Sequence, residues 1–133
     1  MIIKIQPDKQ KAIALKKMAE ITLERISKTD LEKYPSNTLT DYCDIIHKLM
    51  EAISLAKGYK SKGEGAHQEL IDWISKELQL QNQLRDFLQQ MRDYRNRIDY
   101  EGFIVHKNYI ELHAKEINLI INLFISELEK NRE

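Results

Sequence analysis

The sequence predicts an all-α protein, an up-and-down bundle of about five helices that forms a single domain over residues 1–133. Five stretches carry apolar residues at spacings of three and four, the pattern of helices that bury one face. The joins between these stretches are short, which favours neighbouring helices that pack side by side. Charged residues make up 32% of the chain and apolar residues 42%, a balance typical of a folded globule rather than a disordered chain.

The charge balance limits the partners that this chain is expected to have. Lys and Arg number 21, and Asp and Glu number 21, so the formal net charge is zero. A broadly basic surface that binds nucleic acid through many phosphates is not expected, although a local basic site is compatible with this balance. The single cysteine, Cys43, excludes an intrachain disulfide and supplies no metal-binding pair, so we expect no metal and no cofactor.

The apolar segments also bear on location. No apolar run approaches the length of a membrane span, and the stretch at residues 1–6 is too short for a signal peptide. We therefore expect a cytoplasmic protein with no membrane partner.

The chain is expected to begin with a short extended arm and a first helix. Residues 1–6 are rich in apolar side chains, which suggests that the arm packs on another segment. Pro7 and Asp8 favour a helix start, because proline suits the first turn and an acid suits the positive end of the helix dipole. The expected inner face of this helix consists of Ala12, Leu15, Met18, Ala19, Thr22 and Ile26.

A second helix is expected from Thr38 to the residue before Gly58. We interpret residues 28–37 as a connection, because Pro35 should break a helix. Thr38 with an acid three residues later resembles a capped helix start, and Gly58 is a typical helix stop. The expected apolar stripe consists of Tyr42, Ile45, Ile46, Leu49, Ile53 and Ala56. Cys43 and His47 are four residues apart and could meet, but a packed thiol beside a surface or core imidazole is the expected arrangement, since a metal site needs three or four ligands.

Three further helices are expected in the second half of the chain. Residues 59–65 are interpreted as a loop, and residues 66–78 as a third helix. Residues 79–83 are either a short join or a continuation, after which a fourth helix runs to about Tyr100 and Gly102 ends it. The inner face of the third helix consists of His67, Leu70, Ile71, Ile74 and Leu78, and that of the fourth of Leu84, Phe87, Leu88, Met91, Tyr94 and Ile98.

The last helix is expected to run from about Lys107 to Lys130, after a buried crossing segment at residues 103–105. Its apolar stripe consists of Ile110, His113, Ile117, Ile120, Ile121, Phe124 and Leu128, and His106 extends it by one turn. Two imidazoles therefore lie on an apolar face. Each is either a satisfied core or interface histidine or a proton donor or acceptor near the fourth helix.

Arg95 is the residue that the pattern explains least. It falls inside the apolar stripe of the fourth helix, four residues after Met91 and three before Ile98. A guanidinium stays charged and has five N–H donors, so it is rarely buried without a partner. Arg95 therefore pairs with a carboxylate such as Asp93 or Asp99, points into a subunit interface, or faces a cavity that receives an anion.

Several catalytic signatures are missing from the sequence. It contains no Ser-His-Asp pattern, no helical zinc-protease motif, no CxxC and no glycine-rich dinucleotide fingerprint. The loop Gly63-Glu64-Gly65 is too short for a phosphate-binding Walker loop and is interpreted as a turn.

Two stretches in this helical context resemble the HEPN family (higher eukaryotes and prokaryotes nucleotide-binding). They are Leu55-Ala56-Lys57-Gly58-Tyr59-Lys60, a Gly-Tyr-Lys turn after the second helix, and residues 93–102, which carry the Arg95-Asn96 pair late in the fourth. The resemblance implies a homodimer with the Arg-Asn motifs near its interface. It also implies a minimal nucleotidyltransferase as a partner in a toxin–antitoxin-like module, or metal-independent ribonuclease activity.

The chain departs from the family's ribonuclease motif, in which a histidine follows the arginine after about four residues. Counted from Arg95, that position holds Tyr100, and the next histidine is His106. RNA cleavage through the 2′-hydroxyl needs a group that exchanges protons near neutral pH and a cation for the phosphorane charge. A phenol, whose pKa is about 10, is a poor general base at pH 7, but it can stack on a base or bond a phosphate.

Three functions are therefore carried forward. The first is a non-catalytic or weakly active HEPN-like protein that binds a nucleotide, RNA or a nucleotidyltransferase at a dimer cleft. The second is an atypical ribonuclease in which His106 or His113 replaces the missing imidazole, and the third is a dimeric bundle without a ligand. The candidate ligand-binding residues are Arg95, Asn96, Tyr100 and Asp93, with Arg92, His106 and His113 as secondary candidates. The homodimer is expected because the apolar stripes of the last two helices offer more apolar surface than a single five-helix monomer is expected to cover.

Overall fold

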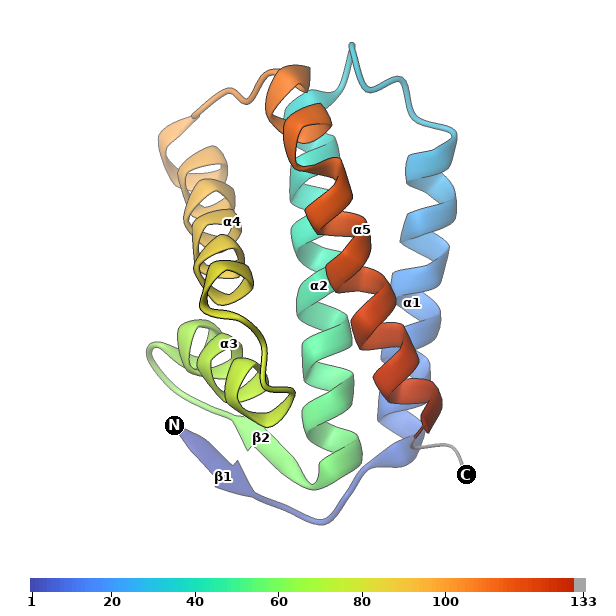
Figure 1. Ribbon diagram of the computed structural model, residues 1–133, viewed down its shortest axis with the longest axis vertical. Coiled ribbons are helices and arrows are strands. Elements are labelled where there is room, and N and C mark those ends of the chain that lie inside the picture. The colour runs from blue at the N-terminus through green and yellow to red at the C-terminus, as the bar shows by residue number, and fades with distance from the viewer. Residues whose placement is uncertain (131–133) are drawn as a thin grey trace.

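The computed structural model describes residues 1–130 and confirms an all-α, bundle-like fold (Figure 1). Within these residues the elements are β1 (Ile2–Lys4), α1 (Lys9–Ser27), α2 (Pro35–Lys57), β2 (Tyr59–Ser61), α3 (Ala66–Glu77), α4 (Asn82–Glu101) and α5 (Lys107–Lys130). None of these helices is long and apolar enough to cross a membrane.

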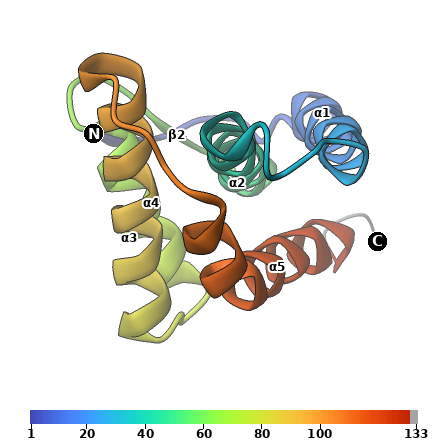
Figure 2. The ribbon, with the colours of Figure 1, turned by 90° about the horizontal axis from the view of Figure 1, so that it is seen from above.

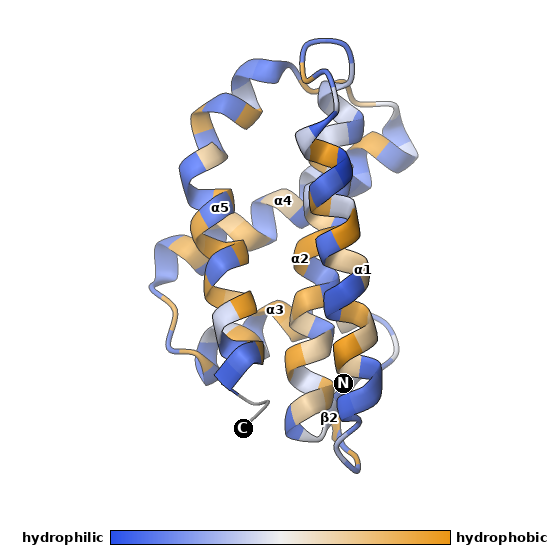
Figure 3. Ribbon diagram, turned by 90° about the vertical axis from the view of Figure 1, so that its right-hand side faces the viewer, coloured by the Kyte–Doolittle hydropathy of each residue, from blue (hydrophilic) through white to orange (hydrophobic). Residues whose placement is uncertain are grey.

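Helix α2 is the centre of the bundle. It contacts each of the other four helices, and α1 has its main contacts with α2 alone. Seen from above, α3 and α4 lie on one side of α2, α1 lies on the other, and α5 covers a third side (Figure 2). Figure 3 shows hydrophobic and hydrophilic residues alternating along α1 and α5, as expected for helices with one buried face. The fully buried core includes Leu39, Ile45, Leu49, Ile53, Ile74, Ile120 and Phe124.

The predicted start of α2 was wrong by three residues. Pro35 does not break the helix but occupies its first turn, where its missing N–H is not needed. Thr38 is buried inside the helix, and its hydroxyl donates to the Tyr34 carbonyl at 2.7 Å instead of capping. Asp8, by contrast, caps α1 as its position suggests, because its side chain accepts from the Lys11 amide at 3.0 Å.

The N-terminal arm is extended and packs on a segment that was predicted to be a loop. Strand β1 pairs antiparallel with β2, with Ile2 opposite Ser61. Gly58 joins α2 to β2 with a positive φ of 86°, and its carbonyl accepts from the Ile5 amide at 2.8 Å. A Cβ on Gly58 would lie 2.9 Å from the Ile5 carbonyl oxygen, so this close approach requires glycine.

The apolar faces of α4 and α5 are largely used inside the monomer. Phe87, Leu88 and Met91 of α4 are buried, as are the six aliphatic and aromatic positions of the α5 stripe. The excess apolar face that led us to expect a dimer is therefore not located there. Two smaller expectations were also wrong: Met18 is 50% exposed, and in the segment at residues 103–105 only Val105 is buried, while Ile104 is 72% exposed.

Candidate functional site

Arg95 lies on the flank of α4 that faces α2, and its partner comes from α2. Its Nη2 lies 2.8 Å from Oδ1 of Asp44, and both side chains are about one-third exposed, at 31% and 35%. Asp93, one of the two predicted partners, is exposed on the opposite side of α4. Arg95 Nε is buried, and no hydrogen-bond partner for it lies within residues 1–130. The guanidinium thus keeps donors that its own protein does not use.

Two imidazoles lie beside this guanidinium. His47 of α2 and His67 of α3 have ring centroids 4.3 Å apart, and the rings are tilted by 60°. Arg92, one turn before Arg95 on α4, is close enough for its charge to act on His67. We call the set His47, His67, Arg92 and Arg95 the His–Arg cluster. It is built where α2, α3 and α4 meet.

Burial sets the protonation state of both rings. It lowers the pKa of His67 to about 4, and the charges of His47, Arg92 and Arg95 act in the same direction. Burial also lowers the pKa of His47, although the Glu51 carboxylate opposes that change. Both imidazoles are therefore mainly neutral at pH 7, when each ring has one N–H donor and one acceptor nitrogen.

A small hollow gives access to the two rings. It has a volume of about 150 Å³ and is lined by His47 and His67 together with Glu51, Lys60 and other residues of α2, β2 and α3. Glu51 Oε2 lies 3.7 Å from His47 Nε2, while the buried Nδ1 of His47 has no hydrogen-bond partner among the described residues. A ligand in this hollow can therefore meet the two imidazoles, Lys60 and Glu51, while Arg92 and Arg95 are not among the residues that line it.

Cys43 has a structural role beside the cluster. Its thiol is buried and approaches the Met91 carbonyl at 3.5 Å, and burial raises its pKa to about 12. A thiol that stays protonated is a poor nucleophile and a poor metal ligand. The expected packed thiol is confirmed. The imidazole of His47, which was considered as a neighbour of Cys43, packs against the ring of His67.

The other candidates on α4 do not join the His–Arg cluster. Tyr100 follows Arg95 by five residues, which places it about 140° around the helix, and it is 85% exposed. Asn96 is partly exposed and Asp93 is exposed. The structure therefore brings Arg92 and Arg95 into the cluster but not Asp93, Asn96 and Tyr100.

The two histidines near α5 also lie apart from the cluster. His106 is exposed, so the expectation that it extends the apolar stripe was wrong. His113 stacks on Phe87 with centroids 4.9 Å apart, contacts Tyr109, and lies 3.1 Å from the Glu116 carboxylate through Nδ1. His113 is thus a partly buried, packed histidine whose Nδ1 already has a partner.

His47 and His67 were missed as site residues. In the sequence His47 was weighed only with Cys43, and His67 only as part of an apolar face. A local signal existed, because Asp44 and His47 are three residues apart and share one face of α2 with Glu51. That signal says nothing about His67, which α3 brings in from a separate segment.

Comparisons with known proteins found no match. No protein-family model, no curated protein and no solved structure matches the chain. The resemblance to the HEPN family remains a prediction that rests on the two stretches quoted above.

Proposed function

We propose that this protein is a HEPN-like bundle that binds a phosphate-bearing ligand, a nucleotide or a segment of RNA, at the His–Arg cluster. The observation that carries the proposal is Arg95 itself. Its guanidinium is two-thirds buried beside two neutral imidazoles, and its Nε has no partner among the described residues. A buried donor left without a partner is costly in a folded protein, so its persistence favours a ligand that uses it.

The chemistry of the cluster suits a phosphate. A guanidinium presents its N–H groups in a planar fork that matches two phosphate oxygens, and such charge-assisted bonds are about twice as strong as neutral ones. Within residues 1–130 the one ion pair of Arg95 uses Nη2 alone, so a fork edge remains for a ligand. Arg92 adds a second positive charge, and its Nε donates to the Gln89 side chain at 3.2 Å, which holds it in place.

The imidazoles add recognition without adding charge. A neutral ring can donate to a phosphate oxygen through its N–H or stack on a nucleobase. On one side of the cluster, His67 and Arg92 line a narrow space together with apolar residues, among them Ile46, Met50, Ile71, Leu88 and Met91. Recognition of one or two phosphates fits this small site better than a long nucleic-acid track, as the zero net charge also suggests.

Metal-independent ribonuclease activity is a second candidate, because the cluster holds two imidazoles and a guanidinium, the kinds of group that such cleavage uses. One imidazole would take the proton from the ribose 2′-hydroxyl while its oxygen bonds to phosphorus. The other would give a proton to the departing 5′-oxygen as its bond to phosphorus breaks, and Arg95 would stabilise the phosphorane charge. Because the pKa of both rings is lowered, the base is available at pH 7 but the protonated acid is scarce. Binding is therefore the first proposal and cleavage the second.

A matched pair of arginine variants tests the proposal. Arg95→Ala should weaken binding of ATP or of a short single-stranded RNA by well over tenfold, because it removes the charge that pairs with phosphate. Arg97→Ala is the control, since Arg97 lies on the same helix but its guanidinium covers Phe103 at 4.1 Å and pairs with Glu101. Calorimetric titration of both variants measures the effect. Equal affinities for wild type and Arg95→Ala would contradict the proposal.

A further inference from the structure

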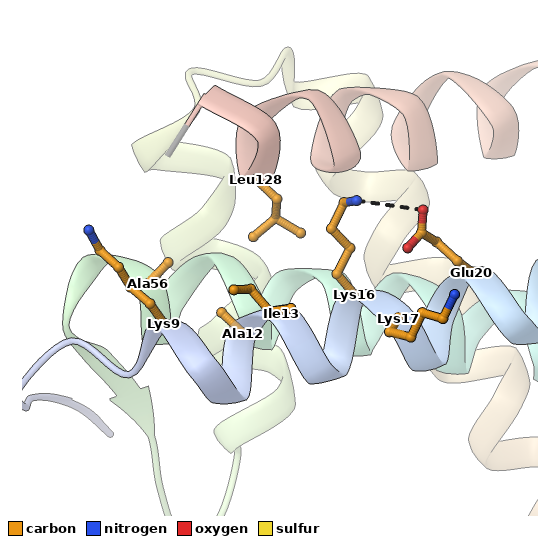
Figure 4. A pocket seen from close by; sticks show the side chains of 8 residues that line it. All are labelled: Lys9, Ala12, Ile13, Lys16, Lys17, Glu20, Ala56 and Leu128. Carbon is orange, nitrogen blue, oxygen red and sulfur yellow. Dashed lines mark ion pairs between the residues drawn. The ribbon is translucent and has the colours of Figure 1, made fainter. Parts of the chain in front are cut away.

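A second hollow lies between α1 and the C-terminal end of α5, away from the His–Arg cluster (Figure 4). Its volume is about 480 Å³, within the range of about 300–1,000 Å³ that is usual for small-molecule sites. It exists because α1 and α5 both pack on α2 and make few contacts with each other. Helix α1 buries only Ala12 and Ala19, so much of its surface near α5 is uncovered.

The floor of the hollow is apolar. Ala12 and Ala56 line the floor and leave space above it, because neither side chain extends beyond Cβ. Leu128 reaches from α5 toward Ala12 and Ile13 on α1 (Figure 4). Ile13 lines the hollow and yet is 53% exposed. An apolar chain laid in the hollow would remove this isoleucine surface from water, which is favourable.

The rim is positively charged. Three lysines and one glutamate line it, namely Lys9, Lys16, Lys17 and Glu20. Lys16 is already neutralised, because its Nζ lies 3.5 Å from Glu20 and 3.9 Å from Glu129. No carboxylate of residues 1–130 forms an ion pair with Lys9 or Lys17. The two residues lie about 12 Å apart along the axis of α1, eight residues at about 1.5 Å each, and Figure 4 shows their side chains extending toward opposite ends of the hollow.

We propose that this hollow binds a medium-chain carboxylate, a small amphiphile with an anionic head. Its alkyl chain would lie on Ala12, Ile13 and Leu128, and its carboxylate would pair with Lys9 or Lys17. The proposal does not depend on the His–Arg cluster, and either proposal can fail without the other.

Three probes with the same chain length separate the contributions of chain and charge. They are decanoate and decyltrimethylammonium, added to the full chain at concentrations up to about 1 mM, and decan-1-ol, added up to its solubility limit. Amide and methyl NMR signals of Ala12, Ala56 and Leu128 report on the floor. We expect decanoate to shift these signals in a saturable way, decan-1-ol to bind at least tenfold more weakly, and the cationic probe not to bind. No response to decanoate, or an equal response to all three, would overturn the proposal.

Variants then test the assigned residues. The double variant Lys9→Glu/Lys17→Glu should weaken decanoate binding at least tenfold and should bind the cationic probe. The control is Lys62→Glu, which should do neither, because Lys62 is exposed but does not line the hollow. Ala56→Leu should fill the hollow and abolish binding. If Ala56→Leu does not fold, the double variant Lys9→Glu/Lys17→Glu still tests the proposal, because it changes only lysines on the rim. Sedimentation of the protein with phosphatidylglycerol vesicles, without any effect of free decanoate, would also overturn the site.

Discussion

Arg95 keeps most of its hydrogen-bonding capacity after it pairs with Asp44. One of its five N–H groups makes the 2.8 Å contact, and its Nε lies buried without a partner among residues 1–130. Since Asp44 is 35% exposed, water can solvate it when the arginine is absent. The pair is thus closer to a surface ion pair, worth about 1 kcal/mol or less, than to a buried one. Because Arg95 contributes little to the stability of the fold, it can be retained for binding a ligand.

His67 should make the free energy of unfolding depend on pH. Burial lowers its folded-state pKa to about 4, and Arg92 and Arg95 of α4 and His47 of α2 act in the same direction. The unfolded chain takes up this proton near pH 6.5, so stability is complete above about pH 6.5 and falls as the pH drops toward 4. Thermal melts between these limits should show a shallower decline for His67→Gln than for wild type.

His106→Gln is the control for that experiment, because His106 is exposed. Its melting temperature should follow the wild-type pH dependence. Parallel curves for wild type and His67→Gln would show that His67 does not hold its neutral form in the fold.

Helix α4 has one face in the core and carries the site on its flank. Met91 is 2% exposed and packs in the core, one turn from Arg95. Met91→Ala should lower the free energy of unfolding by about 2–5 kcal/mol, as large-to-small core changes do. Lys17→Ala, on an exposed part of α1, should change it by less than about 0.5 kcal/mol. Urea unfolding measures both, and equal losses would mean that the helix faces are misassigned.

The elements themselves were largely predictable from periodicity, and their ends less so. The apolar stripes correctly predicted helices α2, α3, α4 and α5. Gly58 and Gly102 end α2 and α4 in the left-handed conformation that favours glycine. Pro35 misled because the same residue breaks a helix interior and suits a first turn. Strand β2 was missed because three residues have too little pattern, and only its pairing with β1 defines it.

The candidate site is assembled from three helices, so only part of it could be predicted from the sequence. The apolar stripe of α4 singled out Arg95, since its position there needs an explanation. Its neighbours Asp44, His47 and His67 lie on two other helices, and no local spacing connects them to Arg95.

The homodimer stays a prediction, but the apolar surface on which it could rest is a different one. The apolar surface left exposed on α5 consists of Leu112, Leu119 and Leu123, outside the stripe first considered.

The central claim is that a phosphate-bearing ligand binds at the His–Arg cluster, and the histidine NMR signals test it most directly. The chain has four histidines, so each imidazole C–H signal can be assigned by single substitution. On titration with a short single-stranded RNA at pH 7, the signals of His47 and His67 should shift together and saturate, and those of His106 and His113 should stay unchanged. Shifts confined to His106 or His113, or no shift of any ring at about 1 mM RNA, would contradict the account.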